Sequence, residues 1–157
     1  MKWLHGARSD GKDSIAVQIA DHEYWPDLRA VILVVSDKEK DTSSTYGMET
    51  SKATSRLLSY RANNVVPNRL EEIERAILNR DFETFGAITM SDSNQFHAIC
   101  LYTFPPIFYM NDVSMAIIKL VHSINADAGK VIAAYTFDAG PNAVIYTLDQ
   151  VTRPEAV

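Results

Sequence analysis

Alternating apolar and polar residues near both ends of the chain predict strands. β-Branched residues recur at every second position over residues 14–19, which is typical of a half-buried strand. Residues 28–36 are apolar on both faces, as expected of a central, covered strand. Two further β-rich runs, 130–138 and 142–148, are joined by a Gly-Pro turn, so we expect them to form an antiparallel hairpin.

Helical spacing replaces this alternation in the middle of the chain. A first helix follows residue 43 and carries Met48, and three more follow with the inward-facing rows Leu70, Ile73 and Ile77; Phe82, Phe85 and Ile88; and Ile117, Ile118, Val121 and Ile124. Pro67 suits a first helical position, Asp81 and either Asn111 or Asp112 suit N-caps, and Gly129 suits a C-terminal cap.

The order of two strands, four helices and two strands predicts an α+β fold. We expect a largely antiparallel four-stranded sheet covered on one face by helices, in a single domain over residues 1–157. A charged loop at 37–42 and a loose tail at 151–157 complete the expected organisation.

Composition narrows the classes of partner and compartment. The net charge of −5 and the absence of a Lys/Arg run argue against nucleic-acid or anionic-membrane binding. Cys100 is the only cysteine, so no intrachain disulfide forms and a reducing compartment is expected. The longest apolar run, 30–35, is too short to span a bilayer, and no signal-peptide core follows Met1. We therefore expect a cytoplasmic protein with no nucleic-acid and no membrane partner.

Asp138 stands at the end of one β-rich run and at the lip of the turn. Tyr135 and Phe137 alternate with it, so its side chain is expected to project away from these aromatics. Gly140 and Pro141 make the corner rigid. The turn alone favours an aspartate that caps its own turn, and the alternative is a carboxylate held stiffly for chemistry.

Three hydroxyl residues, Ser43, Ser44 and Thr45, come just before the first helix. Capping of the helix is the simpler interpretation of this cluster. The same arrangement leaves N–H groups and hydroxyls directed at one point, which is also a phosphate-sized anion site.

Asp92 interrupts the apolar row of the third helix, which continues to Phe96 and Ile99. A buried polar group needs partners, so the 92–97 cluster forms either a polar network in the core or the wall of a pocket. Both interpretations stay open at this point.

Other common chemistries lack a sequence signature. His5, His22, His97 and His122 are not paired at metal-ligand spacing, so we expect no metal site. His97 and Cys100 are best explained as ordinary helix residues. The chain has neither a nucleophile elbow nor a Gly-rich phosphate loop.

Six motifs follow one another along nearly the whole chain: Asp10-Gly-Lys-Asp-Ser-Ile-Ala-Val-Gln18, Leu33-Val-Val-Ser36, Ser43-Ser-Thr-Tyr-Gly-Met48, Asp92-Ser-Asn-Gln-Phe-His97, Phe104-Pro-Pro-Ile-Phe-Tyr-Met-Asn111 and Tyr135-Thr-Phe-Asp-Ala-Gly-Pro-Asn-Ala143. In this order they resemble the C-terminal half of the mevalonate diphosphate decarboxylase family, within the GHMP kinase superfamily. Tyr102 departs from the family, which has an acidic residue before Thr-Phe-Pro-Pro.

The resemblance implies ATP-dependent decarboxylation of (R)-5-diphosphomevalonate to isopentenyl diphosphate, in isoprenoid and sterol precursor synthesis. It implies that Asp138 is the catalytic aspartate, which takes the proton of the substrate 3-hydroxyl or orients that hydroxyl. It also implies that the substrate-binding residues are Ser43, Ser44, Thr45, Met48 and Ala139, the first four near the diphosphate.

The resemblance further implies ATP and Mg²⁺ as family cofactors and a homodimer as the assembly. The family's nucleotide loop belongs to an N-terminal half that this chain does not match, so we expect a fragment that binds neither cofactor alone and is inactive alone. The alternative is a non-catalytic α+β dimerisation or small-molecule-binding module. A kinase acting on another isoprenoid intermediate is a weaker third possibility.

Overall fold

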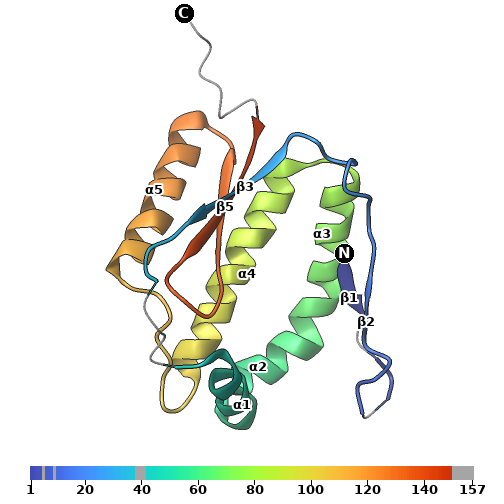
Figure 1. The fold of residues 1–157 in the computed structure, drawn as a ribbon, viewed down its shortest axis with the longest axis vertical. Helices are drawn as coiled ribbons and strands as arrows, with labels where there is room; N and C mark the ends of the chain where they lie inside the picture. The colour runs from blue at the N-terminus through green and yellow to red at the C-terminus, as the bar shows by residue number, and fades with distance from the viewer. Residues whose placement is uncertain (5, 9, 38–41, 150–157) are drawn as a thin grey trace, which may run out of the picture.

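The main sheet has three antiparallel strands in the order β3 (Leu28–Leu33), β5 (Ala143–Leu148) and β4 (Ala133–Phe137) (Figure 1). The computed structural model describes residues 1–4, 6–8, 10–37 and 42–149. β4 and β5 form the predicted hairpin, with Phe137 opposite Ala143. The predicted α+β class with antiparallel strands is confirmed. His5, the middle of the charged loop at 37–42 and the tail at 151–157 lie outside the described residues.

The predicted four-stranded sheet is wrong in its strand count. β2 (Ile15–Val17) pairs with β1 (Lys2–Leu4) in a separate two-stranded ribbon. Ser14 joins the two strands, since its hydroxyl donates to the carbonyl oxygen of Leu4 at 2.9 Å. The Lys2 ammonium binds Glu74 of α3 (Val66–Leu78) at 2.6 Å, which attaches the ribbon beside that helix (Figure 1).

The prediction that residues 28–36 form a covered central strand is also wrong. β3 lies at an edge of the main sheet and pairs with β5. Ile32 is 68% exposed and Val31 is 44% exposed. Apolar residues on both faces of a strand are typical of a strand that is buried on both faces, but no described element covers these side chains.

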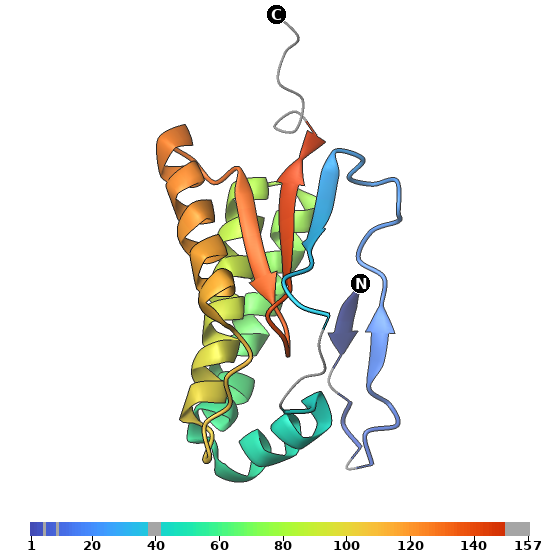
Figure 2. The same cartoon turned by 60° about the vertical axis from the view of Figure 1, so that its left-hand side comes forward.

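The helices gather on one side of the main sheet (Figure 2). In chain order they are α1 (Ser44–Thr54), α2 (Arg56–Tyr60), the π-helical turn η1 (Arg61–Val65), α3, α4 (Phe82–Tyr102) and α5 (Asp112–Ala128). The predicted caps Asp81 and Gly129 are confirmed, because Asp81 accepts from Thr84 N–H at 3.0 Å and Gly129 takes a left-handed conformation with φ 67°. Pro67 is the second residue of α3 rather than the first, and η1 runs directly into this helix. Asn111, rather than Asp112, is the cap of α5 and forms a capping box with Ser114.

Two aromatic clusters hold the helices to the sheet. Tyr135 of β4 is fully buried, and its hydroxyl donates to Asn94 of α4 at 3.0 Å. Tyr146 of β5 packs edge-on against Phe85 of α4. These contacts fix α4 along β4, the strand that leads to Asp138.

One predicted member of the buried row of α5 lies outside the core. Ile124 is 38% exposed, and the next residue, Asn125, is buried instead. The Asn125 amide donates to the carbonyl oxygen of Ala133 at 2.9 Å and accepts from Ile132 N–H at 2.9 Å. A polar side chain turns inward here because it satisfies main-chain groups at the start of β4.

Candidate active site

Asp138 follows β4 directly and is exposed, whereas Tyr135 and Phe137 are buried. The predicted projection away from the aromatics is therefore confirmed. The main chain closes the turn, since Gly140 N–H donates to the Asp138 carbonyl oxygen at 2.8 Å. No residue in the described part of the chain donates to the Asp138 carboxylate, so this group does not act as a cap of its own turn and can accept a hydrogen bond from outside the chain.

Residues of the 92–97 motif support this corner from α4. The buried Ser93 hydroxyl accepts from Phe137 N–H at 3.0 Å. One helical turn later, the buried His97 ring packs edge-on against the Phe137 ring, and the Nε2 of His97 has no described hydrogen-bond partner. Burial lowers the pKa of His97, and a hydrogen bond with the Phe137 main chain and the Asp138 charge each offset part of this shift. The backbone immediately before Asp138 is thus held by a helix.

Ser43 caps α1, with its hydroxyl accepting from Tyr46 N–H at 3.2 Å. The capping interpretation is confirmed for this residue. Ser44 and Thr45 are exposed in the first turn of α1, and their hydroxyls make no hydrogen bond within the described residues. These two hydroxyls and the N–H groups of Ser44 and Thr45 remain available to an anion.

Tyr109 connects the start of α1 to the turn after Asp138. Its hydroxyl lies 3.4 Å from the Ser43 carbonyl oxygen, and its ring belongs to a buried cluster that Ala139 packs against. Gly47 permits this contact, because a Cβ there would lie 2.2 Å from the Tyr109 oxygen. The β4–β5 turn points toward α1 in both ribbon views (Figures 1 and 2). Sequence reasoning did not identify Tyr109 as a site residue, because its contacts with Ser43, Gly47 and Ala139 join segments that are distant in the chain.

Met48 also lies on α1, and its side chain is 64% exposed. No described contact joins it to Asp138 or to Ala139. Its place in the substrate site therefore remains a prediction.

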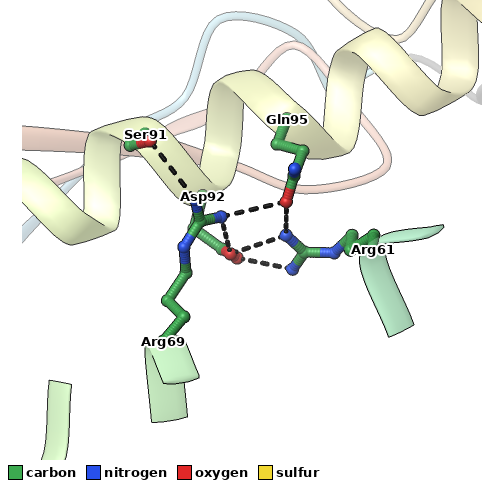
Figure 3. Close-up of polar contacts among 5 residues, drawn as sticks. All are labelled: Arg61, Arg69, Ser91, Asp92 and Gln95. Carbon is green, nitrogen blue, oxygen red and sulfur yellow. Dashed lines mark hydrogen bonds and ion pairs between the residues drawn. The ribbon is translucent and has the colours of Figure 1, made fainter. Parts of the chain in front are cut away.

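Asp92 is both part of a polar network and part of a pocket wall. Arg61 binds it through two hydrogen bonds of 2.7 and 2.9 Å, and Arg69 binds it at 2.7 Å (Figure 3). Burial raises the pKa of the Asp92 carboxyl, but the two arginines outweigh this effect and hold its pKa below the ordinary value. Sequence reasoning missed both arginines, although a spacing of eight positions puts them on similar sides of a helical segment.

The described residues offer no metal site, no reactive thiol near neutral pH and no membrane-spanning helix. They contain no group of three or more His, Cys, Asp or Glu side chains placed to hold a metal ion. Burial raises the pKa of the Cys100 thiol to about 11, so the thiol stays protonated near neutral pH. No described helix has the length and apolar character needed to cross a bilayer.

Comparisons with known proteins agree on one family. The profile of the mevalonate 5-diphosphate decarboxylase C-terminal domain matches residues 30–155. A diphosphomevalonate decarboxylase of Danio rerio is 62% identical over 157 residues, which are 100% of this chain and 39% of that protein. The chain thus spans about two fifths of the length of this relative.

Solved structures show the same fold. An X-ray structure of a mevalonate 5-diphosphate decarboxylase has a TM-score of 0.91 at 55% identity, covering 96% of this chain and 38% of its own. A second, described as MDDEF in complex with MVAPP, AMPPCP and magnesium, has a TM-score of 0.81 at 27% identity, covering 90% of this chain and 42% of its own. This chain belongs to the mevalonate 5-diphosphate decarboxylase C-terminal domain family.

Proposed function

We propose that this chain supplies the acidic half of a site for ATP-dependent decarboxylation of (R)-5-diphosphomevalonate to isopentenyl diphosphate. The observation that carries the proposal is the Asp138 carboxylate, exposed on a corner that α4 holds and without a described hydrogen-bond donor. Family membership and a relative solved with MVAPP support the substrate class.

Asp138 accepts the hydrogen bond of the substrate 3-hydroxyl and aims its oxygen at the phosphoryl group of ATP. The main contribution of the carboxylate under this proposal is orientation, because it fixes the hydroxyl oxygen in position for attack on the phosphoryl group. The new phosphate then leaves with the C–O bond electrons, and the electrons of the bond to the departing carboxylate form the alkene.

The start of α1 holds the diphosphate. Ser44 and Thr45 offer hydroxyls, and the first N–H groups of the helix carry partial positive charge. Ala139 has a small side chain beside the carboxylate and leaves room for the substrate. The Tyr109 cluster keeps the two ends of this site together.

Under this proposal, ATP and Mg²⁺ bind to the part of the relatives that this chain does not cover. Phosphoryl transfer depends on positioning and charge stabilisation around the phosphates, so the chain alone is inactive under this proposal. The proposal includes the cytoplasm as the compartment, which the composition suggests, and a homodimer as the assembly, which the family resemblance suggests.

The test joins this chain to the uncovered N-terminal part of the Danio rerio relative and measures carbon dioxide release. The joined protein should turn over with ATP and (R)-5-diphosphomevalonate, whereas the 157-residue chain should not. Asp138→Asn should lower kcat by about 100-fold or more with a small change in KM. Asp127→Asn, at an exposed aspartate of α5, is the matched control. Unchanged turnover in Asp138→Asn would instead support a non-catalytic role for this chain within the joined protein.

A further inference from the structure

A cavity of about 230 Å³ opens where η1, α3, α4 and β4 meet. Its lining combines the charged side chains of Arg61, Arg69 and Asp92 with aliphatic side chains that include Leu70, Ile73 and Ile88. None of its lining residues belongs to the proposed substrate site. The cavity therefore needs an explanation of its own.

The charges at this cavity do not balance. Arg61 and Arg69 share one carboxylate, Asp92, and the described residues place no second acidic group on either guanidinium (Figure 3). The side chains of the two arginines are only 17% and 21% exposed. One positive charge in excess is thus largely removed from water, which is unfavourable unless an anion accompanies it.

The arginines also have donors to spare. A guanidinium carries five N–H groups. Arg61 uses three of them on Asp92 and the Gln95 side-chain oxygen. Arg69 uses three on Asp92, Gln95 and Ser91. Two N–H groups remain on each guanidinium, and such planar sets of donors suit carboxylate and phosphate oxygens.

We infer that this cavity binds a small anion with a short hydrocarbon group. The carboxylate or phosphate lies on the Arg61–Arg69 pair, and the hydrocarbon packs against Leu70, Ile73 and Ile88. A water molecule occupies roughly 30 Å³, so the cavity volume corresponds to about eight waters or a ligand of similar size. The ligand class is therefore a branched-chain carboxylate or a small alkyl phosphate.

The first test needs no variant. Isovalerate, 3-methylbutyl phosphate and the neutral amide of isovalerate are titrated separately into the 157-residue chain, and amide NMR signals are followed. Saturable shifts are expected at residues 66–73 and 88–92 with both anions, and binding of the neutral amide should be at least tenfold weaker. Tighter binding of one anion identifies the headgroup. Equal binding of amide and carboxylate, or no saturable shift at these residues, overturns the inference.

Variants then separate charge from packing. Arg69→Gln removes the excess charge but keeps the two hydrogen bonds between Arg61 and Asp92, so both anions should bind at least tenfold more weakly. Arg75→Gln, at an exposed arginine of the same helix, should change binding less than twofold. Leu70→Ala should weaken the binding of isovalerate severalfold. It should not change the binding of acetate, which lacks the branched hydrocarbon group. Unchanged isovalerate binding in Arg69→Gln, with an intact amide spectrum, contradicts the proposed site.

Discussion

The hydroxyl of Ser93 accepts a hydrogen bond from the main-chain N–H of Phe137 at 3.0 Å. Both residues are buried, and Phe137 is the last residue of β4, a strand at the edge of the main sheet. An N–H that faces outward from an edge strand has no strand partner. Ser93 supplies one, so α4 fixes the main chain immediately before Asp138.

Replacing Ser93 by alanine should destabilise the fold. Ser93→Ala leaves the Phe137 N–H buried without an acceptor, which costs about 1–3 kcal/mol of unfolding free energy. Urea unfolding of the chain measures this loss. Ser123→Ala, at an exposed serine of α5, is the control and should change stability by less than about 0.5 kcal/mol. Equal losses in the two variants would argue against a structural role for the Ser93 hydroxyl.

Stability should depend on pH through His97. Burial lowers the pKa of His97 from its ordinary 6.5, so the unfolded chain takes up this proton at a higher pH than the folded chain. The contribution of neutral His97 is complete above pH 6.5 and is lost as pH falls through the lowered pKa, with a slope of at most about 1.4 kcal/mol per pH unit. The pKa values of three aspartates, Asp10, Asp81 and Asp92, are also lowered. The stability that these carboxylates contribute is lost only as pH falls below their ordinary pKa of 3.8, outside the range in which His97 titrates.

The measurement is urea unfolding at several pH values between 7 and 5. His97→Gln should show a smaller loss of stability across this range than the unsubstituted chain. Ser123→Ala, at an exposed serine of α5, should keep the original slope. A His97→Gln variant with the full original slope would assign the pH dependence to other groups.

Asp138 should influence the same imidazole directly. Its negative charge raises the pKa of His97 against the effect of burial. Asp138→Asn removes that charge while preserving shape, so the pKa of His97 should fall further. An NMR titration of the His97 ring protons measures the shift, and the His22 ring serves as an internal reference. An unchanged His97 pKa would place the carboxylate too far away for this coupling.

Local signals explain most of what the sequence predicted correctly. Asp138 stands after an alternating run and before a Gly-Pro turn, and both features depend on neighbouring residues only. The helix caps are local in the same sense. Each cap accepts a hydrogen bond from the N–H group three residues later, and the three caps are Ser43, Asp81 and Asn111. The motif around Asp92 was recognisable as polar within an apolar row, but its two possible roles were not distinguishable.

The errors concern partners that are distant in the chain. Strand alternation at 14–19 indicates extended structure but does not specify the neighbour, and β2 pairs with β1 rather than with the main sheet. Asn125 replaces Ile124 in the interior because it bonds to Ile132 and Ala133, a relation that helical spacing does not encode. Arg61 and Arg69 meet Asp92 only after three segments pack together.

Gly47 and Tyr109 should show strong energetic coupling. A Cβ at position 47 would lie 2.2 Å from the Tyr109 oxygen and 3.4 Å from the ring carbon that bears it, so the hydroxyl carries most of the clash. Gly47→Ala should therefore destabilise the chain by about 1–3 kcal/mol through overpacking, reduced by up to about 1 kcal/mol of helix propensity. Tyr109→Phe alone should cost little, because its hydroxyl lies at a long 3.4 Å from the Ser43 carbonyl oxygen.

The double variant distinguishes a steric clash from a general loss of helix packing. Removing the Tyr109 hydroxyl relieves the closest contact, so the double variant should be more stable than the sum of the single changes by about 1 kcal/mol or more. Urea unfolding of the four proteins completes the cycle. Additive changes would show that Gly47 is not needed for the approach of Tyr109, and that α1 is positioned against the Asp138 turn by other contacts.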